Sequence, residues 1–514
     1  MTSRIYGIDL GTTYSCISYV DESGRPVVLN NIEGDQTTPS VVFFEGPDNI
    51  VVGKAAKQAS RAEEGRVVSF VKRNMGDPSY TFDVDGRPYT PEEVSSLILR
   101  KLVQDAEATT GEKITDVVIT CPAYFGIAER EATKNAGVLA GLTVHRILDE
   151  PVAAAICYGV RESGTEETVL VYDLGGGTFD ITVIRIEGGD VKVVYTGGDH
   201  NLGGKDWDER VINYLCEEFM KAEPAAGDPR NEPLFLSELF LQAEDLKRSL
   251  SAREKVKTGV SYGGARAQIE VTREKLEEIT GDLMERTIEL TQSVLKEAEA
   301  RGTSKIDKLL LVGGSSRMPV VTRRLKEVLS LDPQLFEPDL SVAKGAALMA
   351  LTIEAKEGAT FKFPLPPIKD VKTTCSHGFG VIVAKNAAGT EEEVVYLIHE
   401  NTTVPTEASQ TFGTLNHNQT SVNVVVVESN QVESSRVEDN RQIAEGEITR
   451  LSSNLPQGSP IHVTFSLRED ARLDIRAVEP SSGRELTLNV DIAGALSAEQ
   501  VQQKRRDLLT KNVS

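Results

Sequence analysis

One segment of the chain occurs twice, and this repeat constrains the fold more than any other feature. Residues 5–20 read IYGIDLGTTYSCISYV, and residues 170–186 read LVYDLGGGTFDITVIRI. Each copy consists of an apolar strand, an Asp, a Gly/Thr turn and a second β-rich strand. The repeat predicts two related lobes that both begin with the same hairpin.

The turns of the two copies, Gly11–Thr13 and Gly175–Thr178, have the composition of phosphate-binding loops. Glycine lets the backbone approach a phosphate closely, and successive N–H groups form an anion-binding concavity. Asp9 and Asp173 end the preceding strands, where they can orient the waters of Mg²⁺ or an attacking water. Either turn alone is also compatible with an ordinary glycine hairpin, but the shared Asp spacing favours phosphate binding.

The two turns differ from the dinucleotide fingerprint and from the P-loop. Those motifs lead from a strand into a helix, whereas the glycines here lead into a second strand. We therefore expect the phosphate to be clamped between two hairpins, one from each lobe. A third glycine segment, residues 309–324 (LLLVGGSSRMPVVTRR), does lead from strand to helix. Its Gly313 and Gly314 could admit a nucleoside with Arg317 stacked on the base, although a plain strand–helix turn has the same pattern.

The order of elements predicts an α/β domain over residues 1–361. Helical spacing and strand-like apolar runs alternate along this part. The helices are expected at Thr90–Thr109, Asp208–Lys221, Leu234–Leu250 and Lys275–Arg301, and two of the strands at Val117–Thr120 and Val169–Asp173.

A second kind of domain is predicted after a proline-rich boundary. Residues 361–370 read FKFPLPPIKD, and we assign residues 362–370 to a linker. In residues 371–495 apolar and polar side chains alternate in short runs, as in Ile461–Leu467, which predicts an antiparallel β-sandwich. A short polar helix is expected at Leu496–Leu509 within the last segment, residues 496–514.

Composition excludes several classes of function. The chain has 514 residues and a net charge of −22, so a nucleic-acid backbone would be repelled. No apolar run approaches the roughly 20 residues that cross a bilayer, and the first residues read as a strand, which predicts a cytoplasmic protein without a membrane partner. The five cysteines form no CxxC pair, so we expect buried thiols.

Several motifs together resemble the seventy-kilodalton heat-shock chaperones (DnaK-like proteins). The segments DLGTTYSC, CPAYFGIAEREATKNAG, ILDEPVAAAICYG, DLGGGTFD, NLGGKDWD, GGSSRMP and DLSVAKGAA occur in that family's order and span nearly all of residues 1–350. The resemblance implies an actin-like (ribonuclease H-like) two-lobed α/β ATPase domain followed by an all-β peptide-binding sandwich. It also implies an ATP-dependent chaperone that binds and releases extended apolar segments of unfolded proteins, with ATP or ADP, Mg²⁺ and K⁺ as cofactors.

The resemblance carries the family's roles onto matching residues. The catalytic set is Asp9, Lys72, Glu150, Asp173 and Thr178, in which Lys72 contacts the γ-phosphate and orients the attacking water. Asp9, Asp173 and Glu150 surround Mg²⁺, mainly through waters, and Asp180 is a potassium ligand. The other nucleotide contacts are Gly11, Thr12, Thr13, Tyr14, Gly175, Gly176, Gly177, Gly203, Gly204, Glu244, Lys247, Arg248, Ser251, Gly313, Gly314, Ser315, Arg317 and Asp339.

The resemblance is weaker in the sandwich. It places Phe379, Ile382, Val422 and Val424 in an apolar peptide cleft, although alternating residues of this kind also form sandwich cores. Arg146 matches the arginine that docks a J-domain helper, and a nucleotide exchange factor is a further implied partner.

Four departures from the family's pattern concern the coupling between the two domains, the binding of peptide and catalysis. Prolines occupy the linker, which makes its docking as an added strand doubtful. Only the first helix of the family's lid is present, as a remnant at residues 496–514, so bound peptide should leave faster. Lys205 replaces a usual acidic residue, and Asp149 stands where asparagine is common.

These departures leave other functions open. The first is a non-cycling adaptor or exchange-type partner of a full-length chaperone, which need not turn over ATP. The second is a metabolite kinase or a filament former on the same scaffold, although neither explains the sandwich at residues 371–492.

Overall fold

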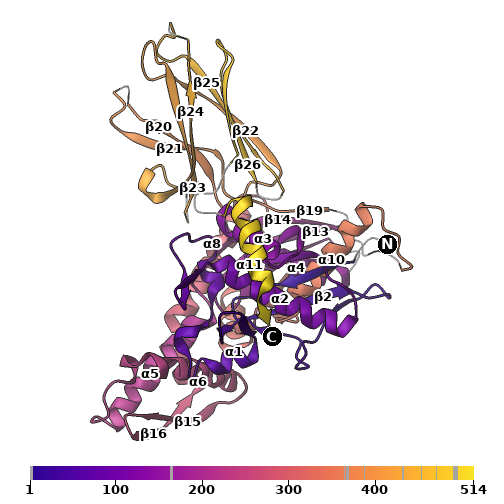
Figure 1. Cartoon of the computed structure of the whole chain (residues 1–514), viewed down its shortest axis with the longest axis vertical. Helices are drawn as coiled ribbons and strands as arrows, with labels where there is room; N and C mark the ends of the chain where they lie inside the picture. Colours follow the sequence, from indigo (N-terminus) through magenta and orange to yellow (C-terminus); the bar gives the residue numbers. More distant parts are fainter. Residues whose placement is uncertain are drawn as a thin grey trace.

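The computed structural model describes residues 4–161, 166–363, 365, 370–386, 388–430, 433–452, 454–469, 472–489 and 496–514. Figure 1 shows a β-sandwich standing on one end of a larger α/β part, with the C-terminal helix α11 running back along that part. Residues 364 and 366–369 of the predicted linker, and residues 490–495 of the predicted sandwich, lie outside the described residues.

The first lobe is built on the sheet that begins the chain. Its strand order is β11-β10-β1-β2-β3, with β4 pairing β2. The strands are β1 (Ile5–Asp9), β2 (Tyr14–Val20), β3 (Pro26–Val28), β4 (Thr38–Pro39), β10 (Asp116–Cys121) and β11 (Thr143–Asp149). The helices α2 (Pro91–Thr110), α3 (Ile127–Leu139) and α4 (Glu150–Arg161) belong to the same lobe. Helix α2 begins where predicted, because Thr90 and Glu93 form a capping box around Pro91.

The second lobe repeats this plan. Its sheet has the order β18-β17-β12-β13-β14-β19. The strands are β12 (Glu167–Leu174), β13 (Phe179–Glu187), β14 (Asp190–Asp199), β17 (Lys308–Val312), β18 (Pro333–Leu335) and β19 (Asp370–Lys372). Since β1–β2 and β12–β13 are both antiparallel hairpins, the predicted repeat is confirmed. Helix α10 (Ser341–Lys356) contacts β1 and α4, and α9 (Pro319–Leu329) follows β17.

Each lobe carries a smaller outlying part. In the first lobe these are α1 (Lys54–Ala59), the strands β5 (Val42–Phe44), β6 (Asn49–Val52) and β7 (Val67–Val68), and the hairpin β8 (Phe82–Val84) with β9 (Arg87–Tyr89). In the second lobe they are α5 (Gly204–Ala222), α6 (Pro233–Ala252) and α7 (Arg273–Ile279), with the hairpin β15 (Lys255–Tyr262) and β16 (Ala265–Thr272). Helix α8 (Gly281–Ala300) instead packs on β13 and β14 of the main sheet. Single 3₁₀ turns occur at η1 (Glu64–Arg66), η2 (Val71–Asn74), η3 (Pro229–Asn231), η4 (Gly314–Arg317) and η5 (Val437–Asp439).

One predicted helix, Lys275–Arg301, is wrong as a continuous element. The structure divides it into α7 and α8 at Thr280, whose φ of −118° and ψ of 12° are not helical. The Thr280 hydroxyl turns back to donate to the carbonyl of Leu276 at 2.7 Å, and Gly281 follows. A Thr–Gly pair therefore ends one helix and begins the next, although the apolar spacing continues across the break.

The sandwich has the predicted antiparallel pairing. One sheet has the order β21-β20-β23-β24 and the other β22-β25-β26-β27. The strands are β20 (Phe379–Ala384), β21 (Glu392–Ile398), β22 (Thr406–Gly413), β23 (Ser421–Ser429), β24 (Asn440–Thr449), β25 (Pro460–Leu467), β26 (Leu473–Glu479) and β27 (Arg484–Asn489). Phe379, Val426, Phe465 and Ile475 meet in a common core between the sheets.

The C-terminal segment belongs structurally to the first lobe. Helix α11 (Ala498–Thr510) packs on α3, and its Val501 and Leu508 are buried in the lobe's core. The short strand β28 (Asn512–Val513) then adds to β6 in parallel, giving the sheet order β28-β6-β5-β7. The helix was predicted from the sequence, but the strand and the docking position were not.

The expectations about cysteines and membrane-spanning segments can be compared with the structure. All five cysteines lie within the described residues and form no disulfide, and four of them are buried, which agrees with the expected thiols. Among the described residues, no helix combines the length and the apolar character needed to span a membrane.

Candidate nucleotide site

The two Gly/Thr turns meet face to face between the lobes. A Cβ atom added to Gly176 would lie 2.2 Å from the hydroxyl oxygen of Thr13, and one added to Gly177 would lie 2.3 Å from the Thr12 methyl. Real side chains do not tolerate such distances, so glycine is required at both positions. The structure thus brings together the two hairpin turns that the sequence singled out.

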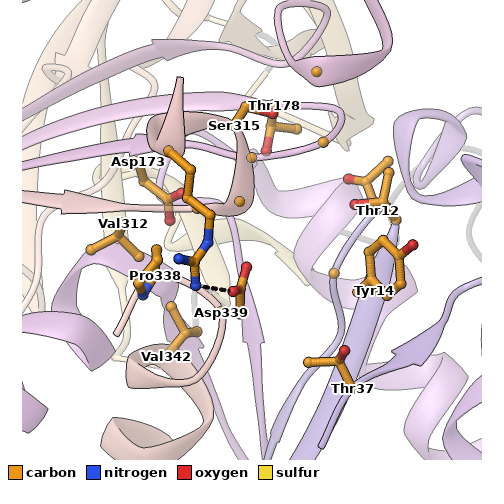
Figure 2. Close-up of a pocket in the computed structure, with 18 of the residues that line it drawn as sticks. Thr12, Tyr14, Thr37, Asp173, Thr178, Val312, Ser315, Pro338, Asp339 and Val342 are labelled. Carbon is orange, nitrogen blue, oxygen red and sulfur yellow. Dashed lines mark hydrogen bonds and ion pairs between the residues drawn. The ribbon is translucent and has the colours of Figure 1, made fainter. Parts of the chain in front are cut away.

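A cavity of about 710 Å³ lies beside these turns. In Figure 2, Thr12, Tyr14 and Thr37 of the first lobe lie across it from Asp173, Thr178 and Ser315 of the second. Most of the predicted site residues line this one cavity: Asp9, Gly11, Thr12, Thr13, Tyr14, Lys72, Glu150, Asp173, Gly175, Gly176, Thr178, Gly204, Glu244, Lys247, Arg248, Ser251, Gly313, Gly314, Ser315, Arg317 and Asp339. Gly177, Gly203 and Asp180 are not among the lining residues. Gly203 packs directly against Gly177, since a Cβ atom on Gly203 would lie 2.6 Å from the carbonyl carbon of Gly177, and Asp180 is buried on β13.

Lys72 and Glu150 form a buried ion pair at the bottom of the cavity. Lys72 lies in η2 and follows Phe70, whose φ of 57° is left-handed and turns the chain sharply. Glu150 is the first residue of α4. Burial alone would lower the pKa of the lysine, but Glu150 and Asp9 reverse this effect and raise it. Lys72 is therefore a fixed positive charge at all ordinary pH values.

Carboxylates crowd around this pair. Burial, with repulsion from Glu150, raises the pKa of Asp9 to about 7 and that of Asp180 to about 8. The pKa of Asp173 is raised well above its usual range for the same two reasons. A bound cation lowers the repulsion between carboxylates that are buried close together. This set of oxygen donors therefore fits a hydrated Mg²⁺ and a potassium ion.

The backbone and a neighbouring hydroxyl group orient two of these carboxylates. Among the described residues, no three His, Cys, Asp or Glu side chains converge closely enough to ligate a single metal ion directly. The backbone N–H of Tyr124 donates to Asp180 at 3.0 Å, and the Thr120 hydroxyl donates to Asp9 at 3.3 Å. Both carboxylates are thus oriented by the protein before any ion arrives.

Polar bridges close the lobes over the cavity. The Tyr14 hydroxyl donates to Glu244 at 3.1 Å, and Lys57 donates to Tyr14 at 3.0 Å while it also pairs with Glu244. Arg73 of the first lobe binds Asp206 and the carbonyl of Gly177 in the second. Lys57 was missed from the sequence, because a lone lysine on a short helix carries no motif.

The cavity residues that are expected around adenosine are held in place by ion pairs. Lys247 binds Asp208 at 2.8 Å and the carbonyl of Gly204 at 2.7 Å. Burial, opposed by Lys247, raises the pKa of Asp208 to about 6. Arg317 is paired with Asp339, as the dashed line in Figure 2 shows, so its guanidinium is held in place beside the cavity. Asp208 lies in the NLGGKDWD motif, but sequence reasoning assigned it no role.

The predicted cleft residues divide between the two faces of one sheet. Phe379 and Val424 are buried in the sandwich core, and Val422 is half-buried at its edge. Ile382 follows Val381 on β20 and therefore points to the face opposite that core residue.

The sandwich touches the α/β part through hydrogen bonds and through Ile127 of α3, which packs in the sandwich's hydrophobic core. Asn401 exchanges two hydrogen bonds with the backbone of Thr196, at 2.8 and 3.2 Å. The buried Glu428 accepts from the backbone N–H of Ile127 at 3.1 Å. Arg146, the residue matched to J-domain docking, lies 3.9 Å from Glu469 of the sandwich. Asp149 forms an ion pair with Arg130.

Whether the proline-containing linker itself docks as an added strand lies outside the described residues, but the residues that follow it can be compared with this expectation. An added strand does form, since Asp370–Lys372 pairs in parallel with Asp190–Lys192 of β14. The described strand begins at Asp370, beyond the prolines at positions 364, 366 and 367.

Comparison with known protein families gives a result that covers nearly the whole chain. The family model described as Hsp70 protein matches residues 5–83 and 75–512.

Proposed function

Because the chain belongs to the Hsp70 family, we propose that it hydrolyses ATP and that the nucleotide controls how its sandwich holds extended apolar peptides. Members of this family are ATP-dependent chaperones. The observation that carries the proposal is the cavity between the lobes, whose lining combines both Gly/Thr turns with Lys72 and Glu150.

Phosphoryl transfer requires positioning and charge neutralisation more than covalent chemistry. The N–H groups and hydroxyls of Gly11–Thr13 and Gly175–Thr178 would bind the phosphate oxygens from two sides. Lys72, held by Glu150, would meet the terminal phosphate and orient the attacking water. Bound Mg²⁺ would neutralise phosphate charge, and its waters would be held by Asp9, Asp173 and Glu150, with Asp180 beside a potassium ion.

The role of Lys72 is tested by Lys72→Ala. Hydrolysis should fall by about a thousandfold, as when one preorganised charge is removed from an active site, while ATP still binds. Single-turnover hydrolysis and nucleotide titration measure the two effects separately. Lys326→Ala is a matched control, because Lys326 is exposed and pairs with Asp332 on the surface. Undiminished turnover in Lys72→Ala would refute this assignment.

Coupling between the domains is tested by the dissociation rate of a labelled, extended apolar peptide in ADP and in ATP. We expect ATP to speed release many-fold, because a ligand shifts an equilibrium only by binding one state better than the other. Ile382 and Val422, which are half-buried, are the predicted cleft residues to substitute. Equal rates in the two nucleotides would contradict a coupled cycle.

One observation favours the alternative of a non-cycling adaptor. The sandwich is fastened to the ATPase part on both sides, through β19 and through α11 with β28. Such fastening would suit a protein that holds one arrangement for a partner chaperone. Steady-state ATP hydrolysis by the chain alone distinguishes the two functions, since an adaptor need not turn over.

The helper proteins are further proposals. Arg146 is the residue proposed to meet a J-domain, and its position beside Glu469 places it at the edge between the two domains. A J-domain that accelerates hydrolysis by the unaltered chain but not by Arg146→Ala would support this assignment.

A further inference from the structure

Lys205 occupies a position in the cavity that the assignments above leave without a role. It is the second residue of α5 and lines the cavity from the second lobe. Its backbone N–H donates to the carbonyl of Gly176 at 2.8 Å, which ties it to the Gly/Thr turn of that lobe. Its ammonium lies 5.2 Å from the ring centre of Phe70, which lines the cavity from the first lobe.

The charges of the cavity single out this lysine. Each of the other cationic side chains in the described lining is paired with a carboxylate of the same lining: Lys72 with Glu150, Lys247 with Asp208, Arg248 with Glu244, and Arg317 with Asp339. Lys205 instead has Glu209 of its own helix at 3.6 Å, a half-exposed residue outside the lining. Among the described lining residues, Lys205 thus has no carboxylate as its ion-pair partner.

The local backbone does not account for a lysine here. The first turn of α5 carries partial positive charge, which Asp206 offsets by accepting from the backbone N–H of Gly203 at 2.7 Å, so a lysine there gains nothing from the helix end itself. The Lys205 side chain is 27% exposed, and its ammonium lies over the Phe70 ring at the edge of the cavity. An anion bound beside Gly176 would lie next to this lysine.

We propose that Lys205 binds the terminal phosphates of the nucleotide from the second lobe, opposite Lys72 of the first, and so increases the preference for ATP over ADP. This inference rests on the proposed nucleotide-binding function. The negative charge of a nucleotide grows with each phosphate, so a lysine at the terminal end contributes most to the triphosphate. The contact with Phe70 is the resting position of the ammonium.

The test uses the full chain and the substitution Lys205→Met, which keeps an unbranched apolar side chain at this position and removes the ammonium that lies over Phe70. ATP, ADP and adenosine are titrated at fixed Mg²⁺. We expect affinity for ATP to fall by about tenfold, as for one partly exposed charge-assisted hydrogen bond, while affinity for ADP and adenosine changes by less than about twofold. The ATP affinity of the variant should also depend less steeply on salt.

Lys221→Met is the matched control, because Lys221 lies on the same helix, is exposed and pairs with Glu218 away from the cavity. It should change none of the three affinities. An equal loss of ATP, ADP and adenosine binding in Lys205→Met would show that the residue only holds the lobes together, and it would overturn the inference. If the unaltered chain bound no ATP, both this inference and the proposed function would be refuted.

Discussion

The sandwich is attached to the ATPase part at two places whose chemistry differs. On one side, β19 and the loops around Asn401 and Glu428 meet the second lobe and α3 through several hydrogen bonds and two buried apolar side chains, Val371 and Ile127. On the other side, α11 and β28 bury Val501, Leu508 and Val513 in the hydrophobic core of the first lobe.

This difference separates a contact that can open from one that resembles a domain core. A typical hydrogen bond contributes only about 1 kcal/mol net, because water competes for both partners. A buried aliphatic side chain contributes roughly 1.5–3 kcal/mol. We therefore expect residues 496–514 to stay on the first lobe while the sandwich docks and undocks.

Polar contacts fix the position of the C-terminal segment as well. Arg100 donates to the carbonyls of Leu508 and Lys511, and Lys504 pairs with the buried Glu93. The backbone N–H of Ser514 donates to Ile50, and that of Val52 donates to Ser514, both at 2.9 Å. These contacts determine the orientation of the helix, whereas the apolar side chains supply most of the stability.

Deleting residues 496–514 should produce the largest effect. Three buried side chains leave the first lobe, and their removal should lower its free energy of unfolding by about 5 kcal/mol. Urea unfolding of the deletion variant in saturating ADP measures this loss. Adding a peptide of residues 496–514 in trans should restore part of it. A first lobe of unchanged stability would show that the segment is only a surface attachment.

Leu508→Ala should give the next largest effect. Leu508 is fully buried, and a buried Leu→Ala change costs about 2–5 kcal/mol of unfolding free energy. Its neighbour Leu509 is 45% exposed, so Leu509→Ala should cost less than about 0.5 kcal/mol. Thermal unfolding of the two variants in parallel provides the measurement. Similar melting temperatures would contradict the packing described for α11.

Asn401→Ala should weaken docking without affecting the first lobe. The change removes both hydrogen bonds to Thr196 and places alanine at a φ of 57°, at a cost of about 1–3 kcal/mol. A fluorescence distance between the sandwich and the second lobe reports docking, and urea unfolding reports the lobe. Asn401→Gly accepts the positive φ, so it separates the lost hydrogen bonds from the strain. A loss of lobe stability in either variant would contradict the distinction between the two attachments.

How much of the site could be predicted from sequence depends on whether its residues are neighbours along the chain. The turns Gly11–Thr13 and Gly175–Thr178 are short segments in which several neighbouring residues serve one ligand, so the pattern is visible along the chain. Lys57 contacts Tyr14 and Glu244 from a short helix without a motif, and Asp208 lies at the end of NLGGKDWD, where the sequence does not show that it pairs with Lys247. Only the folded chain places them.

The sandwich and the C-terminal segment show other limits. Alternation along β20 and β23 predicted the strands, but it does not tell a cleft face from a core face, and Phe379 and Val424 lie in the core. The polar helix after the sandwich was visible from its spacing. Its partner was not, because docking depends on complementary surfaces of α2 and α3, and a two-residue strand such as β28 has too few residues to show a period.

The smallest predicted effect is a pH dependence of docking. Glu428 is buried between α3 and the sandwich, with His377, Glu129 and Arg441 around it. Burial raises its pKa, helped by Glu129 and opposed by His377, Arg441 and the N–H of Ile127. The docked state therefore holds a proton that the undocked state releases near the usual glutamate pKa of about 4.3. Docking should be strongest below that pH and should weaken as pH rises through the raised pKa.

Glu428→Gln isolates this effect, because the amide oxygen can still accept from Ile127 but the side chain does not titrate. His200 lies across Tyr124 from His377 and contributes with the opposite sign. Burial lowers the pKa of His200, so its contribution to the free energy of docking becomes more favourable as pH rises toward about 6.5. Glu400 of the sandwich accepts from Tyr195 of the second lobe at 3.0 Å, and burial raises its pKa, so it adds a weakening of the same sign as that of Glu428. The variant should thus show a smaller weakening with pH, with the contributions of Glu400 and His200 unchanged. The fluorescence distance between the domains, followed from pH 4.5 to 8, compares the two proteins. An unchanged profile in Glu428→Gln would assign the pH dependence to other groups and leave the hydrogen bonds of Asn401 as the main determinant of the polar attachment.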